Sequence, residues 1–168
     1  CFDGKIITNR FRLVKLLANN DLGNVSLDMR FNGHMAQGHP IHGIFRGAVQ
    51  QLTYKNYPYR DIRLNGHFDR EGIEGSLSSQ DPTLDLSLDG LVDLSENAPN
   101  INIALDLRHL RMDALGLTDK LEDSDIGLKL YVNFSGTHID HINGYLVMDS
   151  LMITNAGDSV TMRQLKTT

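Results

Sequence analysis

Three aspartates within one short segment are the first candidates for acid–base or metal chemistry. Asp85, Asp89 and Asp93 recur at four-residue intervals in an alternating run. In an extended chain four residues span about 13 Å, whereas one Ca²⁺ binds oxygens at about 2.3–2.6 Å. The three carboxylates therefore cannot share an ion. We interpret them as the solvated face of a strand, and we predict no metal site there.

Two histidine pairs are the second candidate, and zinc binding is the chemistry that they suggest. His39-Pro-Ile-His42 and His138-Ile-Asp-His141 each precede an Ile-x-Gly segment. A zinc site would need further ligands at defined spacing, and the only cysteine is Cys1. Loop histidines on a polar surface are the simpler interpretation.

Signatures of other chemistries are missing from the sequence. It contains no nucleophile elbow, phosphate loop, HExxH helix or EF-hand loop. The segment Tyr54–Tyr59 is either an aromatic contact patch or a set of hairpin tyrosines that pack across strands. We therefore predict a protein that is not an enzyme and that has no cofactor.

Composition excludes several classes of partner. The 168 residues include 16 Lys or Arg and 21 Asp or Glu, for a net charge of −5, which argues against a nucleic-acid-binding face. No apolar run reaches the roughly 18–20 residues that span a bilayer, and no signal peptide is recognisable. Both ends interrupt strand-like runs. We therefore expect a segment of a longer protein, with any membrane anchor or targeting signal outside these residues.

Alternation of apolar and polar residues dominates the chain and predicts strands with one apolar and one wet face. The predicted apolar positions are Val25, Leu27, Met29, Phe31, Ile62, Leu64, Phe68, Leu84, Leu86, Leu88, Val92, Ile101, Ile103, Leu105, Leu107, Ile126, Leu128, Leu130, Val132 and Phe134. These twenty residues indicate an all-β, antiparallel fold.

Glycine dipeptides and one proline predict where the strands turn. Tight turns or bulges are expected at Asn32-Gly33, Asn65-Gly66, Ser135-Gly136 and Asn143-Gly144, a bulge or bend at Asp89-Gly90, and a hairpin tip at Tyr57-Pro58-Tyr59.

Two stretches with helical spacing, Phe11–Asn19 and Asp113–Leu121, predict one or two short helices. Each precedes an acidic turn and a strand that ends in glycine. Val25–Gly33 matches Leu128–Gly136, 103 positions further on. We therefore expect residues 1–168 to form a single β-rich fragment with two weak repeats, approximately 1–100 and an incomplete 101–168.

The apolar face must be covered, because each large apolar side chain gains roughly 1.5–3 kcal/mol on leaving water. A sandwich or barrel would cover the face with itself, whereas a curled sheet would form a groove for an apolar ligand. Composition alone favours the self-filled core, because the apolar face carries few polar groups to orient a ligand.

The sequence resembles the TamB/AsmA-like family, in particular the long TamB-type translocation and assembly proteins of Bacteroidetes-like bacteria. The resemblance covers nearly the whole chain and rests on Leu13–Leu17 followed by Asp21–Leu27, on Ala48–Tyr59 with Arg60–Gly66, and on Asp81–Gly90, Leu107–Leu117 and Val132–Gly136.

This resemblance implies a periplasmic protein anchored in the inner membrane of a Gram-negative bacterium. Its body would be a curled "β-taco" sheet, and the twenty apolar positions would line a groove for phospholipid acyl chains or a hydrophobic client. The family is implicated in lipid transport to the outer membrane and in protein assembly there with an outer-membrane barrel partner. The family has no catalytic residues that could be assigned to positions in this sequence. A structural or adhesive β-sandwich repeat of a bacterial envelope protein is the alternative.

Overall fold

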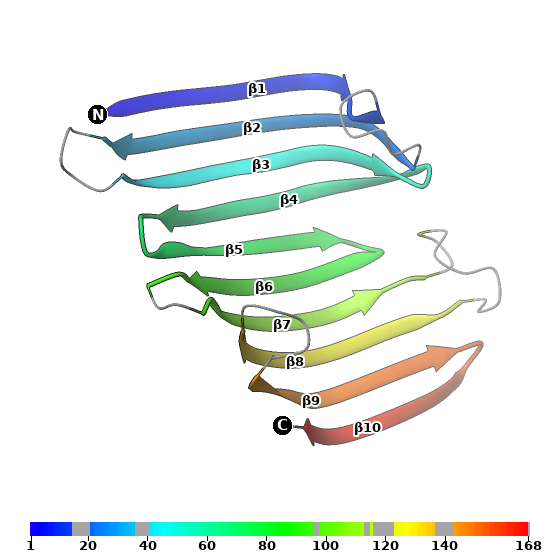
Figure 1. The fold of residues 1–168 in the computed structure, drawn as a ribbon. Helices are drawn as coiled ribbons and strands as arrows, with labels where there is room; N and C mark the ends of the chain where they lie inside the picture. The colour runs from blue at the N-terminus through cyan, green and yellow to red at the C-terminus, as the bar shows by residue number, and fades with distance from the viewer. Residues whose placement is uncertain are drawn as a thin grey trace.

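Ten strands form one antiparallel sheet in which strand order follows chain order (Figure 1). The computed structural model describes residues 1–14, 21–35, 41–95, 98–112, 115, 123–136 and 143–167. The strands are β1 (Phe2–Arg12), β2 (Leu22–His34), β3 (His42–Tyr54), β4 (Tyr57–Phe68), β5 (Gly72–Asp81), β6 (Leu84–Asp93), β7 (Asn100–Leu110), β8 (Asp125–Ser135), β9 (Asn143–Asn155) and β10 (Asp158–Thr167).

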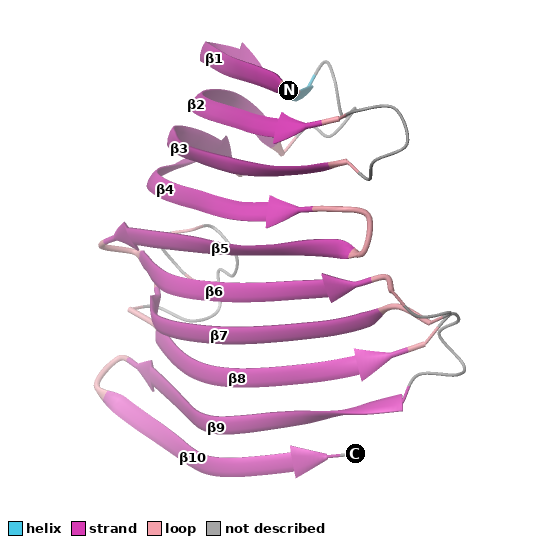
Figure 2. Ribbon diagram, turned by 90° about the vertical axis from the view of Figure 1, so that its left-hand side faces the viewer, coloured by secondary structure: helices cyan, strands magenta, loops and turns pink. Residues whose placement is uncertain are grey.

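The all-β antiparallel fold class is confirmed, and the sheet is an open single layer with weak curl (Figure 2). Its accessible surface is 11605 Å² for 18.8 kDa, against roughly 8300 Å² for a compact monomer of that mass. All ten described strands belong to this sheet. The sandwich alternative required a second sheet, which the described residues do not contain.

The predicted helix at Phe11–Asn19 is wrong at its start, because Phe11 and Arg12 belong to β1. Val14 is the only helical residue among those described, and residues 15–19 lie outside them. Of the second predicted helix, Asp113–Leu121, only Leu115 is described. It lies in a turn and is almost fully buried.

Most of the glycine dipeptides lie inside strands, which corrects the predicted turns. Asn32-Gly33 continues β2, Asn65-Gly66 continues β4, and Asp89-Gly90 continues β6 without a shift of register. Ser135-Gly136 and Asn143-Gly144 do flank the connection from β8 to β9. The tip of the β3–β4 hairpin is Lys55-Asn56, two residues before the predicted position, and both residues have positive φ.

Aromatic rings that cross the strands explain why glycines occupy these interior positions. Gly66 lies opposite Phe45 on β3, and a Cβ on Gly66 would come closer than 3.0 Å to the Phe45 ring. A Cβ on Gly43 would likewise come within 2.8 Å of the Phe68 ring. Glycine therefore leaves room for a ring of the neighbouring strand at these positions, a cross-strand arrangement that pins register.

Each of the two matched segments of the proposed repeat lies on one strand, which is followed by a connection and the next strand. Val25–Gly33 lies in β2 before β3, and Leu128–Gly136 covers most of β8 before β9. The division into repeats stays a prediction.

Candidate functional site

The strand register brings all twenty predicted apolar residues to one face of the sheet. Residues directly opposite each other on paired strands share a face, and successive residues alternate between faces. The pairs Leu64 with Leu77 and Leu105 with Leu130 are examples. We call this side the apolar face and the opposite side the polar face.

One row of the apolar face crosses all ten strands without a polar side chain. It consists of Ile6, Met29, Gly47, Leu64, Leu77, Leu88, Leu105, Leu130, Met148 and Leu165. We call it the central row. With neighbouring strands about 4.8 Å apart, ten strands make it about 43 Å long. One leaflet of a bilayer has an apolar thickness of about 15 Å, so an acyl chain fits along the row.

Side chains of the apolar face are only partly buried. Of the twenty predicted residues, Val25 and Leu107 are buried and the others are half-buried. Each strand makes its extensive contacts with its neighbours in the sheet alone. Contact with same-face neighbours therefore accounts for the burial, and no second layer of described strands covers this face.

The same face carries apolar residues that the sequence analysis did not select. They include Phe2 and Ile6 on β1, Phe45, Val49 and Leu52 on β3, Tyr59 on β4, Ile73 and Leu77 on β5, Leu146, Met148, Leu151 and Ile153 on β9, and Leu165 on β10. Register shifts interrupt the alternation in β3 and β9. Before the shift, β3 still places every second residue on this face, namely Phe45, Gly47 and Val49. That short alternating run was the sequence pattern that could have predicted these positions.

The polar face carries the ion pairs between strand residues. Lys5 Nζ lies 3.0 Å from Asp28 Oδ2, and His109 Nδ1 lies 2.8 Å from Asp125 Oδ2. Lys129 lies opposite Asp106 in the register. This face is therefore stabilised by polar contacts and is compatible with water.

The aspartates of β6 lie on the polar face, as their interpretation as a solvated face requires. Hydrogen bonds from Arg108 lower the pKa of Asp85. Hydrogen bonds from Ser95, first from its side chain and second from its backbone N–H at 2.8 Å, lower the pKa of Asp93. Asp89 is exposed. Each carboxylate thus has its own surroundings, and none shares a ligand with the next.

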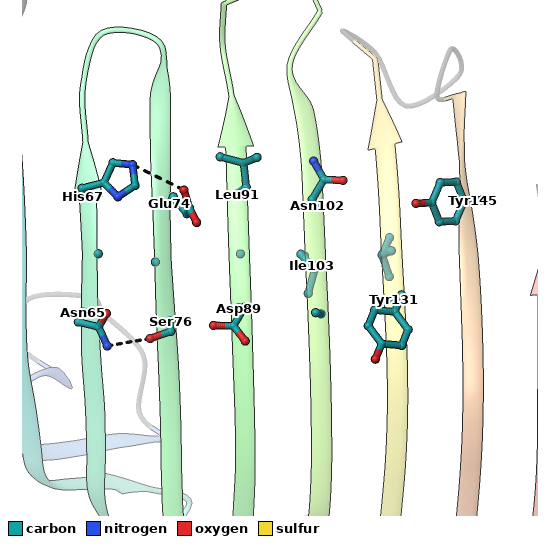
Figure 3. Close-up of a pocket in the computed structure, with 15 residues that line it drawn as sticks. Asn65, His67, Glu74, Ser76, Asp89, Leu91, Asn102, Ile103, Tyr131 and Tyr145 are labelled. Atoms are coloured by element: carbon teal, nitrogen blue, oxygen red, sulfur yellow. Dashed lines mark hydrogen bonds and ion pairs between the residues drawn. The ribbon is translucent and has the colours of Figure 1, made fainter.

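A shallow hollow of about 410 Å³ lies on the polar face over β4 to β9 (Figure 3). Asn65 donates a hydrogen bond of 2.7 Å to Ser76, and His67 lies 3.6 Å from Glu74 at one end. Tyr131 and Tyr145 border the other end. The hollow follows a row of glycines, Gly66, Gly75 and Gly90. Nearly all its side chains face away from the predicted groove lining, and only Ile103 and Val132 of the twenty border it.

The remaining candidates of the sequence analysis do not converge on a site. His42 stacks on His34 with ring centroids 5.8 Å apart, while His39, His138 and His141 lie outside the described residues. Within the described ranges no three His, Cys, Asp or Glu side chains are placed to hold a metal. Tyr59 is buried and packs edge-on against Tyr57, which favours hairpin packing over an exposed aromatic patch.

The described residues include no helix with the length and apolar character needed to cross a membrane. In comparisons with known proteins, no family model and no curated protein matches the sequence, and no solved structure matches the chain.

Proposed function

We propose that the chain is a passive, non-enzymatic scaffold whose apolar face binds phospholipid acyl chains or a similar hydrophobic client. The central row carries this proposal, because it runs without a polar side chain across all ten strands. A contiguous apolar surface of this extent on a soluble protein marks an interaction site.

The chemistry of the apolar face fits a chain-like aliphatic ligand. Leu, Ile, Val and Met dominate it, and an acyl chain needs only such a wall. Half-buried side chains gain about 25 cal/mol for each Å² of apolar surface that a ligand removes from water. A ligand with convergent polar groups would need partners that the central row does not offer.

The resemblance to TamB/AsmA-like proteins adds a cellular role to this proposal. In that role the protein is periplasmic and part of a molecule anchored in the inner membrane. Its apolar face guides phospholipid towards the outer membrane or takes part in protein assembly there. The outer-membrane barrel partner would contact other parts of the protein, and nucleic acid is not a ligand.

Adjacent residues of β8 offer a matched test of the proposal. Leu130 lies on the apolar face, and Tyr131 is exposed on the polar face. The chain and its Leu130→Asp and Tyr131→Asp variants are purified from a bacterial host and examined by native mass spectrometry with lipid extraction. We expect co-purified phospholipid with wild type and Tyr131→Asp and little with Leu130→Asp, while circular dichroism shows the same strand content in all three.

Two outcomes contradict the proposal. Lipid lost from Tyr131→Asp and retained by Leu130→Asp would move the ligand to the polar face. A lipid-free wild type that also fails to bind a hydrophobic dye would mean that the apolar face is covered. Leu105→Asp, on the neighbouring strand, provides an independent repeat of the test.

A further inference from the structure

Three basic residues lie side by side across β1, β2 and β3 on the polar face. Lys5 is directly opposite Arg30, and Arg30 is directly opposite Arg46. Directly opposite residues have Cβ atoms about 4.5–5.5 Å apart. The register therefore brings three positive charges into one short row, which we call the basic row.

Among the described residues, only one member of the basic row forms an ion pair. Lys5 pairs with Asp28 at 3.0 Å. For Arg30 and Arg46 the described part of the chain offers no carboxylate within ion-pair distance. Like charges directly opposite each other destabilise a sheet, so this pair of arginines lowers stability in the absence of an anion.

A hollow of about 420 Å³ lies over the basic row. Lys5, Arg30 and Arg46 line it, together with Asp3, Phe31, Asn32 and Ile44. Asp3 is its only carboxylate, and it accepts a hydrogen bond of 3.3 Å from the Asn32 side chain. The lining thus has a surplus of positive charge, and the exposed Ile44 adds an apolar wall.

The distribution of charge along the sheet makes the electrostatic potential around β1 to β4 more positive. Strands β1 to β4 carry seven Lys or Arg and three Asp, namely Lys5, Arg10, Arg12, Arg30, Arg46, Arg60 and Arg63 with Asp3, Asp28 and Asp61. Strands β5 and β6 carry five acidic residues and no basic one. A chain with a net charge of −5 therefore has a positive region around the basic row.

We propose that the basic row is an anion-binding site for a phosphate group with two negative charges. Arginine pairs bind phosphate oxygens through paired N–H donors, and Arg30 and Arg46 lie side by side with no ion-pair partner among the described residues. A bound phosphate would also relieve the repulsion between them. The hollow has room for part of the molecule that bears the phosphate, with Ile44 beside it. This proposal does not depend on ligand binding at the apolar face.

The test compares the chain with an Arg30→Gln/Arg46→Gln variant and with an Arg163→Gln/Lys166→Gln control. The control removes two exposed positive charges from β10, at the opposite edge of the polar face. Inorganic phosphate is titrated at constant ionic strength while binding is followed by calorimetry and by the unfolding temperature.

Two results together would support the site. Saturable phosphate binding should weaken at least tenfold in Arg30→Gln/Arg46→Gln and persist in the control. Without phosphate, the same variant should unfold about 1–3 °C higher than wild type, because the repulsion is gone. Equal binding by all three proteins, equal weakening in both variants, or a lower unfolding temperature of the Arg30→Gln/Arg46→Gln variant would overturn it.

Vesicles distinguish the two sources of such a phosphate. Tighter binding to phosphatidylcholine vesicles that contain phosphatidic acid than to pure phosphatidylcholine vesicles, with inorganic phosphate removing the difference, assigns a lipid headgroup. Binding of inorganic phosphate alone assigns a soluble phosphate ester. Vesicle binding that survives loss of Arg30 and Arg46, together with inorganic phosphate that binds Arg30→Gln/Arg46→Gln as tightly as wild type, would overturn the site, because the apolar face alone would account for such vesicle binding.

Discussion

The Tyr57 hydroxyl donates a hydrogen bond of 2.7 Å to Asp81 Oδ1, at the end of the sheet where β4 and β5 no longer pair through their backbones. Backbone pairing between these strands covers only the six pairs from Arg63–Ser78 to Phe68–Ile73. Thr83 donates to the same oxygen from its backbone N–H at 2.9 Å and from its hydroxyl at 2.6 Å. One carboxylate thus joins the start of β4 to the β5–β6 turn.

Removing the Tyr57 hydroxyl should destabilise the sheet. A hydrogen bond to a buried charged group contributes about 1.5–3 kcal/mol, so Tyr57→Phe is expected to lower the free energy of unfolding by about that amount in urea titrations. Tyr54→Phe is the control, because the Tyr54 hydroxyl has no hydrogen-bond partner among the described residues. Equal stability of Tyr57→Phe and wild type would contradict a stabilising role for this contact.

Asp81 should make stability depend on pH in the acid range. Burial by itself raises its pKa, but the hydrogen bonds from Thr83 and Tyr57 outweigh burial and bring the pKa below its ordinary value. A depressed folded-state pKa contributes stability above the unfolded value of about 3.9, and this stability is lost as pH falls through the folded pKa. Burial also raises the pKa of Tyr57, so its hydroxyl remains a donor at neutral pH.

The variant Asp81→Asn isolates this effect, because it keeps an acceptor of similar shape and removes the titration. The stability advantage of wild type over Asp81→Asn should be greatest near pH 7 and should shrink as unfolding is measured down to pH 3. Parallel stability curves for the two proteins over that range would show that Asp81 does not titrate differently in the folded state.

Gly66 should not tolerate a side chain. A Cβ there would come closer than 3.0 Å to the Glu74 carbonyl oxygen and to the Phe45 ring, and overpacking of this kind costs about 1–3 kcal/mol. Gly66→Ala is therefore expected to lower the unfolding midpoint in denaturant. Gly4→Ala, where no heavy atom lies within 4 Å of the new Cβ, should be neutral or slightly stabilising. If Gly4→Ala lowered the unfolding midpoint more than Gly66→Ala, the packing of the Phe45 ring over the glycines would be refuted.

The apolar face could be predicted because strand alternation is a local property of the sequence. Runs such as Ile126–Phe134 contain their own period, so each residue's face follows from its neighbours in the chain. The rows that join strands are not local. The opposition of Arg30 and Arg46 depends on how β2 pairs with β3 after the connection that follows His34, and no pattern within one strand predicts that pairing.

The wrong turn predictions have the same origin. Asn65-Gly66 is a common turn dipeptide, yet here Gly66 is needed because Phe45 crosses it from another strand. The polar hollow was missed for a related reason, because its residues are spread from β4 to β9 and have no common sequence motif. The position of Lys55-Asn56 at the hairpin tip shows that two residues with positive φ need not include glycine.

The most direct test of the proposed function is to map where an acyl chain contacts the sheet. A phospholipid with a photoactivatable diazirine in its acyl chain is bound to the protein, activated by light, and located by peptide mass spectrometry. The account predicts adducts on the central row, at residues such as Leu64, Leu88, Leu105 and Leu130, with excess unlabelled lipid abolishing them. Adducts confined to the polar hollow, at Leu91, Tyr131 and Tyr145, would contradict it.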